Sequence, residues 1–490
     1  MRFLSLLTLS LMGISATCTA AEKLVGESDK LSLDISIYNQ NLALVKDVRK
    51  VSLEQGVNDI AFEGVAEKIK SETAILYSDG LTVLEQNYDY DLLTANNIVD
   101  KSVGDVVKTV VQNPTTGENI YNKAKIVSAS YGLPILEFDY GIEANFPGRL
   151  VFEKLPASLR NKPTLVAKVI SDTVANKNIS LAYLTNGISW KTNYVAKVTD
   201  KDKLNLTGWV TINNESGIDY NNAKVQLIAG NVNEVVSYTA RPMMLKAAVN
   251  DMAVAESALT RGASQQDLSG YHLYTLPNKT TIKDKQTKQI SLIEKNAVKY
   301  KKEAKLSSHL YFSPNSNSEF EQVHPEMYYV INNNEADNLG LQLPAGIVRF
   351  YENDDSGNLQ FIGENSISHV AKGETIRLRL GSFVNMFANG KVKQIKKLSE
   401  SAPIKDGTRC NNIKSVYSYD AEIEFTNSGK NPQEVVYTQN LPQESEILVE
   451  SIKGGLKNAS TYEWRFTVPA DGKQVLNFVI KAPNTKRECN

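Results

Sequence analysis

Nearly every segment of this chain with a clear hydrophobic period has a period of two residues. Between positions 417 and 425 the odd-numbered residues are apolar or aromatic, from Tyr417 to Phe425, and the residues between them are polar or charged. Successive side chains of a β-strand point to opposite faces, so this pattern predicts a strand with one face in a core and one in water. The same alternation recurs at 190–198, 204–212, 462–468 and 476–480.

Strands of this spacing, without helical periods between them, predict an all-β protein of several antiparallel β-sandwiches. Turn-forming residues at 78–80 (SDG), 354–357 (DDSG) and 469–472 (PADG) predict hairpins between neighbouring strands. A doubly wound sheet is disfavoured because no helices alternate with the strands.

Changes in composition predict the domain boundaries. We expect an N-terminal β module at 22–100, a small β-barrel-like insertion at 101–155, a central sandwich in two parts at 156–240 and 269–398, and an immunoglobulin-like module at 405–490. A Met- and Ala-rich stretch at 241–268 interrupts the central sandwich as a mobile linker or a short helix. Its irregularly spaced methionines disfavour a copper site.

The first 21 residues have the features of a signal peptide. Arg2 precedes an apolar run at 3–14, and small residues at 15–21 (SATCTAA) provide a cleavage site. The apolar run is too short to span a bilayer, which takes about 20 residues. Cys18 is preceded by Thr17 and Ser15, a poor lipid-attachment motif, so plain cleavage is favoured. We therefore expect a periplasmic or secreted protein without a transmembrane segment after cleavage.

Two of the three cysteines, Cys410 and Cys489, remain after this cleavage, and they bracket the last module. In an oxidising compartment they are expected to form a disulfide, with two reduced thiols as the alternative.

The charges are balanced, with 54 Lys and Arg against 55 Asp and Glu, which disfavours a nucleic-acid partner. Two lysine clusters stand out, one of eight lysines within 283–305 and one of four within 391–397. They suit either contact with an anionic envelope polymer or protection of exposed strand edges, and the second is the commoner use of such lysines.

Few residues favour catalysis. The four histidines, His272, His309, His324 and His369, are scattered, and no zinc, nucleophile-elbow or phosphate-loop motif is present, so no metal and no cofactor is predicted. The weak catalytic candidates are His369 with the flanking Glu364 and Glu374, in a polar segment between two strands. Structural hydrogen bonding of that segment is the favoured alternative.

A second group of carboxylates, Glu137 and Asp139, lies beside aromatic residues, as in many glycoside hydrolases. Their alternation with apolar neighbours favours instead the solvated face of a strand.

Several stretches resemble a bacterial family of exported proteins that is known as a domain of unknown function and is related to mucoidy-inhibitor-like proteins. The segment 181–194 (LAYLTNGISWKTNY) carries the resemblance most specifically, and the others are 84–93, 146–152, 208–211, 214–217, 222–227, 271–274, 343–349 and 363–374. The chain departs from the family at Val370 and Ala371, where Thr-Pro is more usual, which weakens a reactive role for that segment. The resemblance implies an all-β envelope protein and supplies no activity.

These observations predict a non-enzymatic, exported β-sandwich protein that binds another envelope component, either a protein or a polymer. The alternative is a hydrolase of envelope polysaccharide or peptide that uses carboxylates and His369. A third hypothesis is pairing of an exposed strand edge with a partner. The oligomeric state is left open.

Overall fold

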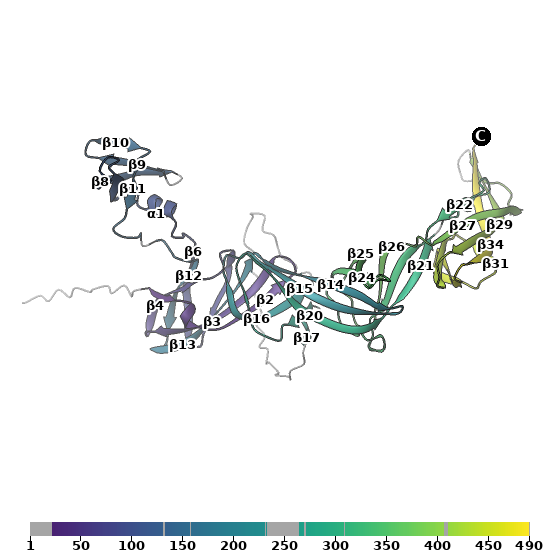
Figure 1. Cartoon of the computed structure of the whole chain (residues 1–490), viewed down its shortest axis with the longest axis horizontal. Helices are drawn as coiled ribbons and strands as arrows, with labels where there is room; N and C mark the ends of the chain where they lie inside the picture. The colour runs from purple at the N-terminus through teal and green to yellow at the C-terminus, as the bar shows by residue number, and fades with distance from the viewer. Residues whose placement is uncertain are drawn as a thin grey trace, which may run out of the picture. The chain divides into compact units, whose positions relative to one another are not determined.

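The computed structural model describes residues 22–130, 133–156, 158–230, 232, 264–268, 271–307, 309–405 and 410–489. Within these ranges the chain forms strands β1–β34, the α-helix α1 (Ala95–Lys101) and the 3-10 turns η1 (Glu27–Asp29) and η2 (Glu335–Asp337) (Figure 1). The all-β prediction is confirmed. In the described part of the chain, no helix has the length and apolar character needed to cross a membrane.

The chain divides into two compact units, and each is built from separate stretches of sequence. The first comprises Met1–Trp190 and Ile212–Lys288, and the second comprises Lys191–Thr211 and Gln289–Asn490.

The first unit contains a four-stranded and an eight-stranded sheet. Sheet A has the order β1 (Lys23–Val25), β4 (Gly56–Glu63), β12 (Thr164–Ser171), β6 (Leu81–Asp89). Sheet B has the order β17 (Ser264–Leu268), β18 (Tyr271–Thr275), β16 (Tyr220–Ala229), β2 (Lys30–Tyr38), β3 (Leu42–Leu53), β13 (Ala175–Asn186), β5 (Ile69–Tyr77), and β19 (Thr280–Ile282) also pairs with β16.

Arg49 on β3 ties these two sheets together. Its side chain is fully buried, and its Nη1 donates to the carbonyl oxygens of Val25 and Glu63, each at 2.7 Å, at the ends of β1 and β4. Asp47 Oδ2 accepts hydrogen bonds from Arg49 Nη2 at 2.6 Å and from Nε at 3.1 Å. A buried charge is tolerated where an opposite charge and hydrogen-bond partners surround it in this way.

The predicted insertion at 101–155 contains sheet D, a five-stranded antiparallel sheet. Its order is β10 (Gly141–Ala144), β9 (Leu133–Phe138), β8 (Asn119–Ser130), β7 (Val106–Gln112), β11 (Arg149–Val151). A small core on one face is formed by Val107, Ala124, Ile126, Leu136 and Phe138. Helix α1 precedes the sheet, and Thr94 caps it by accepting a hydrogen bond from the backbone N–H of Asn97.

Three further sheets are drawn mainly from the second unit. Sheet E has the order β20 (Gln286–Lys299), β15 (Lys203–Asn214), β14 (Ile188–Asp200), β24 (Gly346–Asn353), β25 (Leu359–Ile367). Sheet G has the order β26 (Thr375–Ser382), β23 (Glu326–Asn332), β21 (Lys301–Ser307), β30 (Gln433–Asn440), β33 (Thr461–Val468), β32 (Gly455–Asn458). Sheet I has the order β22 (Glu319–Val323), β27 (Met386–Glu400), β29 (Cys410–Asn427), β34 (Gly472–Cys489), β31 (Glu446–Glu450), and β28 (Ile404–Lys405) pairs with β29. Most pairing is antiparallel, although β21 and β30, among others, run parallel.

Sheets G and I form a β-sandwich. Its core joins Trp464 and Tyr437 of sheet G to Phe425 and Phe478 of sheet I. The predicted immunoglobulin-like module, 405–490, contributes β29 to β34. The same core also contains Leu306 of β21 and further residues of β27, which precede that module in sequence.

The buried faces agree with the period-two pattern. Tyr419, Ala421, Ile423 and Phe425 are buried on β29, and Leu476, Phe478 and Ile480 are buried on β34. Polar residues between them lie at the surface or are only partly covered.

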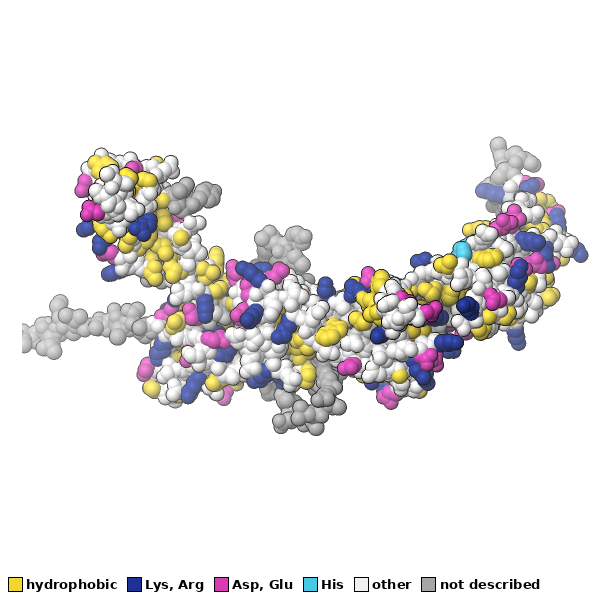
Figure 2. All heavy atoms as spheres, in the orientation of Figure 1, with side chains coloured by type: hydrophobic (Ala, Val, Ile, Leu, Met, Phe, Trp, Pro, Cys, Tyr) yellow, Lys and Arg dark blue, Asp and Glu magenta, His cyan; other side chains and the backbone are white. Residues whose placement is uncertain are grey.

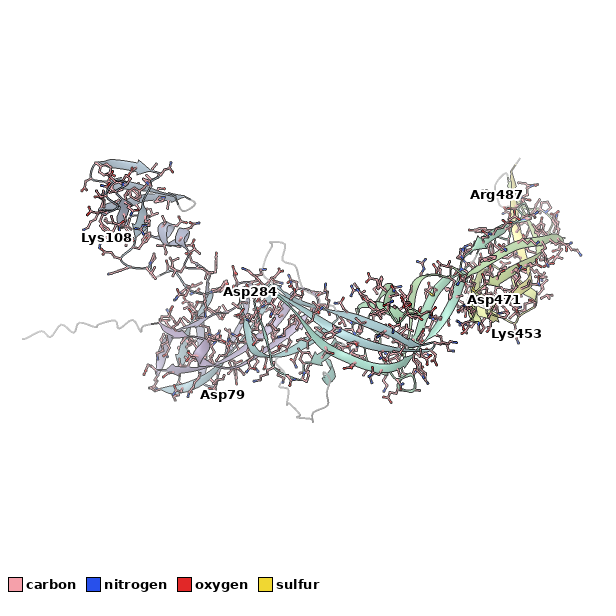
Figure 3. The ribbon with its side chains drawn as sticks, viewed as in Figure 1. Asp79, Lys108, Asp284, Lys453, Asp471 and Arg487 are labelled. Carbon is pink, nitrogen blue, oxygen red and sulfur yellow. The ribbon has the colours of Figure 1, made fainter. Side chains whose placement is uncertain are left out.

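The expected hairpins are only partly present. The turn at 354–357 joins β24 to β25, which pair as a hairpin. The turn at 78–80 instead joins β5 of sheet B to β6 of sheet A, and the turn at 469–472 joins β33 of sheet G to β34 of sheet I (Asp79 and Asp471 are labelled in Figure 3). In these two places the prediction was wrong, because turn residues determine where the chain reverses and not which sheet the next strand enters.

Several predictions concern residues outside the described ranges. These are the signal peptide at 1–21, positions 241–263 of the predicted linker, and the side chains of Cys410 and Cys489. Positions 264–268 of that linker form β17, which pairs with β18.

Candidate functional site

The face of sheet G opposite the sandwich core holds a depression of about 150 Å³, here called the sheet G depression. Six strands contribute to it: the lining residues are Glu303, Lys305, Tyr328, Arg377, Val436, Lys457, Glu463 and Arg465. Strand alternation explains this placement, because Leu306, Tyr437 and Trp464 on the same strands point into the core. The charged residues at the neighbouring positions therefore gather on the other face.

Glu303 lies at the centre of the depression. It is on β21, an interior strand of sheet G, and its side chain is only 9 % exposed. Arg377 Nη1 donates to its Oε2 at 2.6 Å, and Arg465 Nη1 donates to its Oε1 at 3.2 Å. One largely buried carboxylate thus holds two guanidinium groups, which are each almost half exposed.

Glu463 is the second carboxylate of the depression. Arg465 Nε donates to its Oε1 at 2.8 Å, and Lys457 Nζ lies 3.2 Å from its Oε2. Burial acts to raise the pKa of Glu463, but the Lys457 and Arg465 cations outweigh burial and hold the pKa below its ordinary value. The carboxylate is therefore charged at neutral pH.

Lys305 and Tyr328 complete the lining. Lys305 Nζ lies 5.4 Å from the centre of the Tyr328 ring, within the range of a cation–π contact. Burial, together with a hydrogen bond to Glu326, raises the pKa of Tyr328, so its hydroxyl stays protonated.

The depression carries more positive than negative charge. Lys305, Arg377, Lys457 and Arg465 supply four cations, and Glu303 and Glu463 supply two carboxylates. Guanidinium groups present paired N–H donors that match carboxylate and phosphate oxygens. The arrangement is suited to hold an anionic group above the sheet.

The three residues proposed from the sequence lie elsewhere in the second unit. Glu364 on β25 forms an ion pair with Arg349 Nε at 2.9 Å. His369 Nδ1 accepts a hydrogen bond from the backbone N–H of Ala345 at 3.2 Å, and Glu374 Oε2 accepts one from the N–H of Ala371 at 3.1 Å. The contacts of His369 and Glu374 hold local backbone in place, and none of the three residues lines the depression.

Glu137 and Asp139 belong to the first unit. Glu137 is on β9, directly opposite Lys125 and Ile142, and Asp139 follows the strand. Both side chains are exposed, and neither lines the sheet G depression.

The two lysine clusters make different contacts. In the second cluster, Lys393 Nζ lies 3.3 Å from Glu422 and 3.7 Å from Asp420 on the neighbouring strand, and Lys397 pairs with Glu400. In the first cluster, Lys305 lines the depression. Two other lysines of this cluster form ion pairs: Lys302 pairs with Glu352, and Lys299 pairs with Asp337.

Within the described ranges, no group of three or more His, Cys, Asp or Glu side chains is arranged to hold a metal ion. Sequence reasoning did not find the depression, since Glu303 and Arg465 lie 162 residues apart. The sequence pattern that could have indicated the depression is a pair of charged residues at alternate strand positions, as in Glu303 with Lys305 and Glu463 with Arg465.

Comparison with known proteins gives one family match. The model of the family described as Domain of unknown function (DUF4139) matches residues 179–484, more than half of the chain, and this range includes every residue of the depression. No curated protein matches the chain.

Proposed function

Since this chain belongs to the family of Domain of unknown function (DUF4139), whose matched range carries the sheet G depression, we propose that it is a non-enzymatic binding protein of the bacterial cell envelope. It is exported by its first 21 residues and holds an anionic group of another envelope component in the depression. The export features of the sequence and its resemblance to exported, mucoidy-inhibitor-like proteins support the compartment.

The observation that carries this proposal is the pair of guanidinium groups on one buried carboxylate. Glu303 fixes Arg377 and Arg465 in place, so little side-chain entropy is lost when an anion binds. Lys305 and Lys457 extend the positive field on the same face. A polymer that carries repeated carboxylates or phosphates fits this field better than a neutral one.

The test is a titration of the full mature chain with polygalacturonate, a polycarboxylate, and with dextran as a neutral polymer. We expect binding to polygalacturonate that weakens with salt, and no binding to dextran. Arg465→Gln and Arg377→Gln should each weaken the affinity about tenfold, as expected for the loss of one charged hydrogen-bonding partner.

Arg349→Gln is the matched control, because Arg349 also pairs with a carboxylate but lies outside the depression. Equal loss of affinity in this control, or equal binding of both polymers by the wild-type chain, would show that the depression is not the binding site.

A further inference from the structure

Sheet D has a second face, opposite its small core, on which apolar and basic side chains are interspersed. The strand register defines this outer face of sheet D. Val106 lies opposite Lys125, which lies opposite Glu137, which lies opposite Ile142. The next rows place Val151 beside Lys108 and Lys123, and Arg149 beside Val110 and Tyr121.

Apolar side chains on this face are unusually open to solvent, with the exception of Val110, which is only 4 % exposed. Val106, Tyr121 and Ile142 are 63 %, 64 % and 69 % exposed, although residues of these types are common in cores. Figure 2 shows hydrophobic side chains next to Lys and Arg side chains on the surface of the part that holds sheet D. Clustered exposure of this kind is typical of an interaction surface.

The cations on the same face are placed unfavourably for an isolated sheet. Lys108, labelled in Figure 3, lies directly opposite Lys123, and like charges in this position destabilise an antiparallel pair. Four cations, Lys108, Lys123, Lys125 and Arg149, share the face with Glu137, and Glu153 lies 3.0 Å from Lys108 Nζ. The face therefore keeps an excess of positive charge.

We propose that the outer face of sheet D docks on an anionic lipid bilayer. A bilayer of this kind offers many negative head groups to the four cations and an apolar layer to Val106, Tyr121 and Ile142. A polysaccharide would satisfy the cations but would leave the aliphatic side chains of Val106 and Ile142 in water. The surface lies in the first unit and shares no residue with the sheet G depression, so this inference goes beyond the proposed function and does not depend on it.

The test uses the full mature chain and co-sedimentation with vesicles of phosphatidylglycerol and phosphatidylcholine in equal parts, compared with phosphatidylcholine alone. We expect binding only to the anionic vesicles, and weaker binding as salt increases. Lys123→Glu should reduce the affinity at least about fivefold, because it removes one basic residue, which contributes about a fivefold factor near an anionic membrane, and also adds a negative charge.

Lys123→Glu also separates docking from folding. The introduced carboxylate lies opposite Lys108, and this opposite-charge pair should leave the thermal stability unchanged or higher. Ile142→Ser should weaken docking through loss of apolar contact, with little effect on stability because the side chain is exposed.

Two control variants should dock as well as the wild-type chain. Lys201→Glu combined with Lys396→Glu changes charge at exposed positions outside sheet D, and Arg465→Gln disables the sheet G depression. Failure of the wild-type chain to bind the anionic vesicles, or equal loss in Lys123→Glu and in the controls, would overturn the proposal. A protein adduct formed by a photo-crosslinker at position 121, without vesicle binding, would assign the surface to a protein partner instead.

Discussion

At the scale of single residues, Trp464 shows how much one side chain contributes to the sandwich core. It is fully buried, it stacks on Tyr437 at 5.7 Å between ring centres, and its Nε1 donates to Glu450 Oε2 at 2.9 Å. Trp464→Ala should lower the free energy of unfolding by about 3–5 kcal/mol, because it removes the ring and leaves a cavity. Urea denaturation followed by circular dichroism measures this change.

Trp209→Ala is the control for this prediction, since Trp209 is 38 % exposed and should cost clearly less. A loss below about 1 kcal/mol for Trp464→Ala would mean that the core tolerates the cavity and that the ring is not a main support of the sandwich.

The second residue-scale prediction concerns Glu463 and pH. Although burial favours protonation, Lys457 and Arg465 keep its folded-state pKa below the ordinary value of 4.5. A carboxylate with a depressed pKa stabilises the fold above its unfolded-state pKa, and this stabilisation is lost as the pH falls through the folded-state pKa. The difference in free energy of unfolding between the wild-type chain and Glu463→Gln should therefore be constant near neutral pH and shrink below pH 4.5.

Urea denaturation of both proteins across this pH range gives the difference directly. The difference in free energy of unfolding between the wild-type chain and Lys457→Gln should also shrink below pH 4.5, but by a smaller amount, since Arg465 would still pair with the Glu463 carboxylate. A difference that stays the same from neutral to acid pH would contradict the role assigned to these cations.

At the scale of elements, the sequence predicted where the strands lie better than which strands pair with each other. Alternation identified the buried residues of β29 and β34, because burial of every second side chain is a local property of a half-buried strand. The partner of a strand is not a local property. Residues 469–472 have good turn chemistry, yet β33 and β34 enter different sheets. Their partners are fixed by packing of the whole core.

The longest strand pair places the two residues of the predicted disulfide opposite each other. Strands β29 and β34 pair along their full length, and the last pair is Cys410 opposite Cys489. Residues directly opposite each other in antiparallel strands have Cα atoms about 4.5–5.5 Å apart, which a disulfide can bridge. We expect the bond in protein purified from an oxidising compartment, with a stabilisation of up to about 4 kcal/mol.

Alkylation of this protein without reductant, followed by mass spectrometry, should find no modified cysteine in the mature chain, and two after reduction. Two modified thiols before reduction would exclude the bond. Cys489→Ser should lower the thermal stability only in the oxidised protein.

At the scale of the whole molecule, the class of fold was predictable and the candidate site was not. Composition and strand period were sufficient to predict an all-β protein of several sheets. The sheet G depression needs β21, β23, β26, β30, β32 and β33 to lie in one sheet, and no sequence pattern specifies that order. In the sequence, its residues have the pattern of ordinary solvent-exposed strand positions. Only the structure shows that the Glu303 side chain is largely buried by its neighbours.

The division of the chain into two units has a consequence for the order in which it can fold. The first unit needs Ile212–Lys288, and the second needs Lys191–Thr211 as well as Gln289–Asn490. A chain that is synthesised from its N-terminus must hold residues 191–211 without their final partners until residue 289 and those beyond it have been made. The first unit can be completed once Lys288 is available, whereas the second must wait for the C-terminal strands, and in that interval its unpaired strands are open to chaperones and to misfolding.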